Sequence, residues 1–162
     1  MLNLHDPMSY SPIIEPGIGL HEVAPEFTIP DHDNRLYHRD NLMGENGLLM
    51  GFIGDIWNPA NIQRILWLQR HTTSIMRQGF GVALIVRDRP HLLYGFYVST
   101  AKPLQFPLLS DLRGDIHDMF NMGRTPGMVM LDDQFVIRHK WLMPEDRIWP
   151  RIHDLVDVLE AA

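Results

Sequence analysis

The residues best placed to do chemistry lie where a buried strand meets a long helix. Leu48–Ile53 is an unbroken apolar run of strand length, and the segment Trp57-Asn58-Pro59-Ala60-Asn61 follows it. Asn58 before Pro59 predicts a helix start, because Asn is a good helix cap and Pro lacks only an N–H that would be unpaired there. The free N–H groups and the dipole of this helix favour a negative charge, as in many α/β folds.

The side chains at this helix start cannot supply a nucleophile. An Asn carboxamide does not titrate near neutral pH and is not oxidised as a thiol is. The chain contains no Cys, which excludes thiolate chemistry, disulfides and Cys-based metal sites. Two interpretations of Asn58 and Asn61 stay open. They cap the helix, or they form a polar recognition spot for a carboxylate, phosphate or peptide backbone, with Trp57 as an aromatic wall.

The elements around this segment follow from the apolar pattern. Residues 60–78 carry apolar side chains at helical spacing, and residues 79–87 form a second apolar run, so the order strand–helix–strand predicts a parallel, right-handed crossover. We also expect short strands around residues 27–29 and 35–38, helices over 91–100 and 114–122, an edge strand over 136–141 and a last helix from Trp149-Pro150. Residues 1–19 are expected to be an extended arm before one domain of residues 20–162.

Four segments resemble, in the same order, the peroxiredoxin (AhpC/TSA, redoxin) branch of the thioredoxin-like superfamily. They are Ala24–Phe27 (Ala-Pro-Glu-Phe), Trp57–Asn61, Phe106–Asp111 (Phe-Pro-Leu-Leu-Ser-Asp) and Thr125–Asp132, a strand in the family. Trp57–Asn61 also resembles the Trp-Cys-x-x-Cys segment of thioredoxins. The likeness covers about residues 18–162. It implies a thioredoxin-like three-layer α/β/α sandwich with a central mixed β-sheet of about five strands and an N-terminal β-hairpin of peroxiredoxin type.

The resemblance also implies a vestigial site, made of Trp57, Asn58, Pro59, Asn61, Arg124, Thr125 and Pro126. Asn61 stands where the family has its peroxidatic Cys, whose thiolate attacks the peroxide. Arg124 is the nearest candidate for an Arg that the family commonly carries, although it stands two residues earlier. The family's Pro in the Thr-Pro segment is usually cis, so we expect a cis bond before Pro126. Without the thiolate we expect no catalytic residue.

Histidines and methionines raise the alternative of a metal centre. Nitrogen and oxygen ligands are offered by Asp31-His32-Asp33, His38, His21 and His5-Asp6, but none has the spacing of a known metal site. Methionines would suit Cu(I), yet core positions are expected for Met119, Met122, Met128 and Met130. We therefore expect no metal and no cofactor.

Two functional hypotheses follow. The preferred one is a cysteine-less pseudoenzyme, without thiol peroxidase or disulfide reductase activity, that acts as a scaffold and binds a protein or peptide partner. The alternative is an oxidoreductase or metal carrier of this family with a His, Asp or Met metal centre. A homodimer is a further expectation, because peroxiredoxin-like folds often dimerise near this loop; the face would be lined by Ile56, Trp57, Phe96 and Tyr97.

Composition argues against several other classes. The chain has 162 residues and a formal net charge of −6 with no basic cluster, so no nucleic-acid partner is expected. No apolar run reaches the length of a membrane span, and the first residues do not read as a secretory signal, so the cytoplasm is the default expectation. No Gly-rich phosphate loop and no Ser/His/Asp nucleophile pattern is visible.

Overall fold

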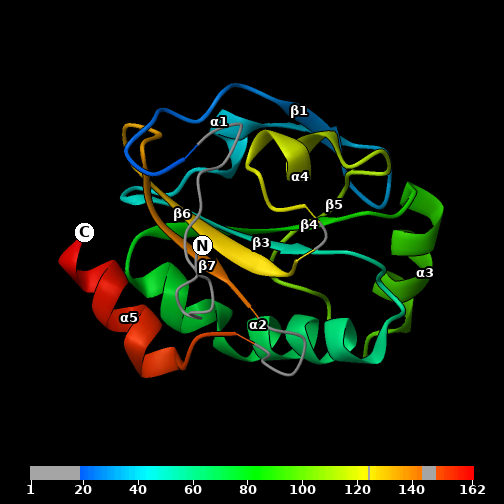
Figure 1. Cartoon of the computed structure of the whole chain (residues 1–162). Coiled ribbons are helices and arrows are strands. Elements are labelled where there is room, and N and C mark those ends of the chain that lie inside the picture. Colours follow the sequence, from blue (N-terminus) through cyan, green and yellow to red (C-terminus); the bar gives the residue numbers. More distant parts are fainter. Residues whose placement is uncertain (1–18, 124, 144–148) are drawn as a thin grey trace, which may run out of the picture.

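The computed structural model describes residues 19–123, 125–143 and 149–162 (Figure 1). The expected arm therefore lies, except for Gly19, outside the described residues. The elements, in chain order, are β1 (Thr28–Pro30), β2 (Leu36–His38), α1 (Arg39–Leu42), β3 (Gly47–Ile53), α2 (Pro59–Arg77), β4 (Phe80–Val86), α3 (Pro90–Ser99), β5 (Leu108–Ser110), α4 (Asp115–Met119), β6 (Gly127–Asp132), β7 (Ile137–Leu142) and α5 (Ile152–Ala161).

Five of the strands form one mixed sheet in the order β5-β4-β3-β6-β7. β3 and β4 run parallel, as do β4 and β5, whereas β6 pairs antiparallel with both β3 and β7. β1 and β2 form a separate antiparallel pair. The mixed sheet, the parallel crossover through α2 and the N-terminal hairpin were all expected, so the sequence-based prediction of the architecture is confirmed.

The sheet lies between two layers (Figure 1). Alternate side chains of β3 point to opposite faces. One face packs against α2, α3 and α5, in a core that includes Leu49, Ile53, Ile65, Leu68, Leu93 and Leu155. The other face packs against the hairpin, α1 and α4, in a core that includes Phe27, Ile29, Leu42, Met50, Phe52 and Ile116. Three of the four methionines considered as copper ligands, Met122, Met128 and Met130, are buried core residues.

β7 forms one edge of the sheet, as predicted, and the start of the domain lies against it. The backbone of His21 donates to the carbonyl of Ile137 (2.8 Å), and Ile137 donates to the carbonyl of Glu22 (3.0 Å). Ala24 donates to the carbonyl of Phe135 (2.8 Å). Residues 21–24 thus cover the beginning of this edge strand.

Three local expectations were wrong. The helix expected over residues 114–122 is shorter, because α4 ends at Met119 and Asn121 has a positive φ of 55°. The last helix begins at Ile152 rather than at Trp149-Pro150. Trp149 is instead buried, and its indole Nε1 donates to the carbonyl of Arg64 in α2 (2.8 Å), so it fastens the chain to α2 before α5 begins. The described residues contain no cis peptide bond, so Pro126 does not follow one. A trans bond is also the ordinary preference of an X–Pro pair.

A membrane-crossing helix is not found either: over the ranges that the structure describes, none is both long and apolar enough for that role.

Gly81 gives a test of the packing between β4 and the end of α1. A Cβ atom at Gly81 would collide with the backbone carbonyl of Leu42. We expect Gly81→Ala to lower the free energy of unfolding by about 1–3 kcal/mol, because the backbone must shift to make room. Gly95→Ala in α3 is the matched control, because a Cβ there meets nothing within 4 Å and should stabilise the helix by about 0.5–1 kcal/mol. Urea denaturation of both variants measures this, and equal effects would contradict the packing described.

Candidate functional site

The loop after β3 and the first turn of α2 form the candidate site. Asn58 has the extended backbone of a helix cap, and its side-chain Oδ1 accepts a hydrogen bond from the N–H of Ala60 (2.9 Å). Pro59 is the first helical residue and has no N–H. The predicted helix start is therefore confirmed, and the first two helical positions present no free N–H group.

Asn61 is buried and its carboxamide is used at both ends. Nδ2 donates to the carbonyl of Asp55 (2.9 Å), and Oδ1 accepts from the guanidinium of Arg64 (2.7 Å). Only 6% of Asn61 and 2% of Arg64 are exposed. The Asn61 side chain thus ties the loop to the helix, and this favours the structural interpretation of Asn61 over the recognition spot.

The same loop positions Trp57 so that about half of its surface is exposed to solvent. Asp55 Oδ1 accepts from the N–H of Trp57 (2.9 Å), and Asp88, just after β4, accepts from the N–H of Ile56 through Oδ2 (2.8 Å). The indole of Trp57 is 48% exposed and meets the ring of Phe96 edge-on, with centroids 5.5 Å apart. A large aromatic side chain is therefore presented by a backbone that is already ordered.

Carboxyl groups lie on the side of this loop that carries Trp57, while the guanidinium of Arg64 is buried on the side of Asn61. Burial raises the pKa of Asp88, and the neighbouring carboxyl of Asp55 raises it further, while the N–H of Ile56 and the charge of Arg89 oppose the shift. Two carboxyl groups that share this space disfavour an anion beside Trp57. Close to Trp57, these two carboxyl groups favour a cationic group over the carboxylate or phosphate considered from the sequence.

The Thr-Pro segment reaches the same end of the sheet. Gly127, which follows Pro126, pairs with Phe52 near the end of β3. Thr125 is exposed and its N–H donates to the carbonyl of Met122 (3.1 Å), whereas the carbonyl of Pro126 accepts from Met143 (2.8 Å). Arg124 lies outside the described residues. The predicted site residues that the structure describes therefore lie at one end of the sheet, where some follow β3 and the others precede the adjacent strand β6.

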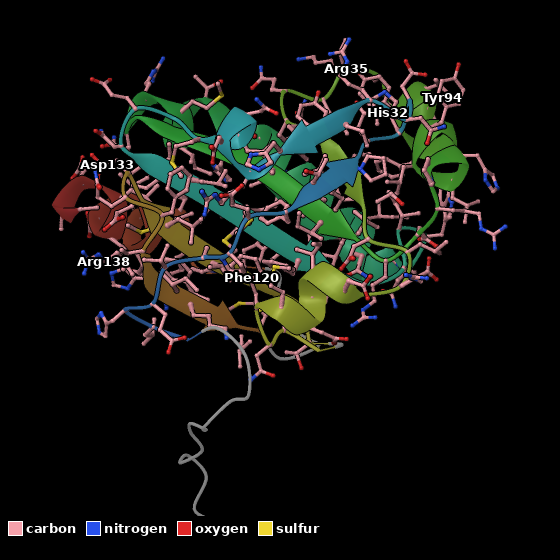
Figure 2. All side chains as sticks on the ribbon, turned by 90° about the horizontal axis from the view of Figure 1, so that it is seen from above. His32, Arg35, Tyr94, Phe120, Asp133 and Arg138 are labelled. Atoms are coloured by element: carbon pink, nitrogen blue, oxygen red, sulfur yellow. The ribbon has the colours of Figure 1, made fainter. Side chains whose placement is uncertain are left out.

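The histidines considered as metal ligands have other surroundings. His32 stacks on Tyr97, with ring centroids 3.9 Å apart, beside Tyr94 (Figure 2). Nε2 of His38 lies 3.0 Å from the carboxylate of Glu26. Within residues 19–123, 125–143 and 149–162 no group of three His, Cys, Asp or Glu side chains could hold a metal ion. His5-Asp6 lies outside these ranges.

A family model settles the relationship that this geometry suggests. The model described as the AhpC/TSA family matches residues 20–142, which is more than half of the chain. The chain belongs to the AhpC/TSA family. No curated protein gives a significant match to the sequence of this family member.

Solved structures show the same fold in peroxiredoxins. The AhpC/TSA domain is similar to the mitochondrial 2-Cys peroxiredoxin of Plasmodium falciparum, with a TM-score of 0.71 and 14% identity over 88% of this chain and 92% of that one. It is similar to the peroxidoxin BcpB of Mycobacterium tuberculosis, with a TM-score of 0.75 and 14% identity over 88% and 96%. It is also similar to the yeast mitochondrial 1-Cys peroxiredoxin, with a TM-score of 0.78 and 10% identity over 89% and 76%. At these identities the likeness concerns the fold.

Sequence reasoning missed three residues of the site. Asp55 and Asp88 each follow the end of a parallel strand, and such ends meet at one edge of a sheet, so their meeting could have been predicted. Arg64 stands one helical turn after Asn61, which places both on one helix face. Its burial had no signal, because an Arg on a helix is usually exposed.

The two Asn side chains at this helix start should differ in their effect on stability. Asn61→Ala leaves the carbonyl of Asp55 and a buried guanidinium nitrogen without these hydrogen bonds, so we expect a loss of about 2–3 kcal/mol in the free energy of unfolding. Asn58→Ala removes only an exposed cap, and we expect a loss of about 1 kcal/mol. Chemical denaturation measures both; a smaller loss for Asn61→Ala than for Asn58→Ala would contradict the structural role of Asn61.

Proposed function

We propose that this AhpC/TSA domain is a binding module without thiol peroxidase or disulfide reductase activity, and that it recognises a protein or peptide partner through the surface that carries Trp57. The observation that supports this most is the state of Asn61: the residue in the place of the peroxidatic Cys is buried and engaged by Asp55 and Arg64. An amide in this position supplies no nucleophile, and removing the nucleophile from such a unit removes most of the rate.

The exposed aromatic surface supports a binding role. Trp57 is 48% exposed, and the rest of its indole packs edge-on against Phe96 of α3. Aromatic side chains that are held rigidly and left half-exposed are typical of binding hot spots. We call Trp57, together with the loop of residues 54–58 that presents it, the Trp57 surface.

The charges beside this surface indicate the chemistry of the partner. The carboxyl group of Asp55 raises the pKa of Asp88, and a cation from a partner would relieve the repulsion between the two groups. The face of an indole also attracts a cation. The proposed partner is therefore a protein segment with a basic side chain next to an apolar one. In the homodimer expected from the sequence, a second copy of the chain would supply this segment.

Capture from the native organism tests this proposal when the wild type is compared with two variants. Trp57→Ala removes the centre of the Trp57 surface, whereas Met76→Ala trims another exposed apolar residue at the far end of α2 and is the control. We expect a partner that is retained by the wild type and by Met76→Ala and is reduced at least about tenfold with Trp57→Ala, which is the loss of a typical hot spot. Equal capture by all three proteins would overturn the proposal. Light scattering of the same three proteins measures whether the chain forms a homodimer through the Trp57 surface.

A thiol introduced at position 61 tests whether the site lacks only its sulfur. The thiol of Asn61→Cys would lie in the first turn of the 19-residue α2, in the place of the amide that contacts the guanidinium of Arg64; both features lower the pKa of a thiol and oppose the effects of burial and of the carboxyl group of Asp55. We expect its pKa, measured by thiolate absorbance, to fall below the ordinary value of about 8.5. Gln63→Cys, exposed in the same turn, is the control. Equal pKa values would contradict the vestigial site, and robust peroxide turnover by the unaltered chain would overturn the proposed absence of activity.

A further inference from the structure

A buried histidine–aspartate pair lies on the opposite face of the sheet from α2. His117, on α4, is 1% exposed, and Asp111, just after β5, is 5% exposed. Nδ1 of His117 lies 2.7 Å from Oδ2 of Asp111, and Nε2 lies 3.0 Å from the carbonyl oxygen of Ile53. Figure 2 looks onto this side of the molecule and marks Phe120, the residue directly after α4. The pair connects the ends of β3 and β5 to α4.

Both neighbours of the imidazole are hydrogen-bond acceptors. A backbone carbonyl such as that of Ile53 carries no proton to give. Asp111 already accepts from the N–H groups of Ile116 (3.0 Å) and His117 (2.8 Å). Burial alone would raise the pKa of Asp111, but the His117 side chain and these two N–H groups together lower it, so the carboxyl group is ionised.

A neutral imidazole cannot satisfy this arrangement. It carries one N–H, so either Asp111 or the carbonyl of Ile53 would face a bare nitrogen lone pair at hydrogen-bond distance. An imidazolium carries two N–H groups and donates to both oxygens. Its charge also balances that of the buried carboxylate, which is the condition under which charges are tolerated in a protein interior.

We propose that His117 is held as an imidazolium in the folded protein, and that its second proton fastens the end of β3 to α4 and so keeps the Trp57 loop in place. The carbonyl that this proton binds belongs to Ile53, the last residue of β3, and the loop of residues 54–58 begins with the next residue. This inference goes beyond the proposed binding function, since it concerns the order of the loop whatever the loop binds.

The other charged groups around α4 have partners of their own. Arg87, directly after β4, donates to a backbone carbonyl (2.8 Å) and lies 3.8 Å from Asp118. Arg113 and Asp115 face each other at the surface (3.8 Å). From the hairpin, Asp31 accepts two N–H groups of its own turn. β3 presents the ring of Phe52 edge-on to His117, with centroids 5.2 Å apart. Asp111 is thus the counter-ion that the structure gives to His117.

Loss of a proton from the His117 ring would weaken the attachment of the loop of residues 54–58. The ionised carboxylate of Asp111 is a stronger acceptor than the carbonyl of Ile53, so the proton leaves Nε2 and its hydrogen bond becomes a contact between two lone pairs. The end of β3 would then lose one of its ties, while Asp88 still holds the N–H of Ile56. We therefore expect the loop amides to open more often once the ring has lost its proton.

Nuclear magnetic resonance of the unaltered, ¹⁵N-labelled chain tests the charge state directly. We expect both ring nitrogens of His117 to show protonated shifts at neutral pH, and the ring to lose its proton on alkaline titration. In that same pH range, hydrogen exchange of the amides of residues 54–58, corrected for its intrinsic pH dependence, should become faster by about tenfold, the factor for one lost hydrogen bond. A single protonated ring nitrogen at neutral pH would overturn the proposal, and so would loop exchange that does not follow the titration of the ring.

A pair of variants separates this role from packing alone. His117→Asn offers no titrating group, so the pH-linked step in loop exchange should vanish. His153→Asn, at an exposed position of α5, is the control and should show the same pH-dependent increase in loop hydrogen exchange as the unaltered chain. A step that survives in His117→Asn would overturn the proposal. Should His117→Asn not fold, the ring shifts of the unaltered chain still decide the matter.

Discussion

β3 is buried along its whole length, from Gly47 to Ile53, and this constraint determines where every other part of the molecule lies. It has strands on both sides, β4 and β6, and side chains on both faces that need cover. One face is covered by α2, which starts only five residues after β3 ends, and the other by the hairpin, α1 and α4. The short connection forces the loop with Trp57, the cap of α2 and Asn61 to the carboxyl end of the central strand.

At this end of the sheet, polar groups are used within the protein. In a thiol enzyme, the free N–H groups and dipole of such a helix favour a thiolate. Here Pro59 has no N–H, and the side chain of Asn58 accepts the N–H of Ala60. Asn61 uses both of its polar side-chain atoms within the protein. A polar group that is buried and fully hydrogen-bonded contributes to stability but has little left to offer a ligand. Among the described residues, this end of the sheet presents the indole of Trp57 and the carboxyl group of Asp55 to solvent.

Much of the fold could be predicted from the sequence, because strong apolar runs and helix signals mark β3, β4 and α2. The limits of α2 were predicted to within one residue, since Asn58 and Pro59 act locally. The start of α5 was wrong, because Trp149 is held by a carbonyl that is 85 residues away in the chain. For the same reason, the buried pairs Asn61–Arg64 and Asp111–His117 had no clear sequence signal. Their roles arise from what surrounds them in three dimensions, and single-residue propensities do not contain that information.

The edge of the sheet at β7 has a consequence for how the domain behaves in pieces. Open strand edges are templates for joining one molecule to another. Residues 21–24 cover the start of this edge through hydrogen bonds with Phe135 and Ile137, and Arg138 and Lys140 add positive charge along it. A chain shortened beyond Ala24 would lose the cover and keep only the charge as protection. Such a truncated domain is expected to aggregate more readily, above all in high salt, where charge repulsion is screened.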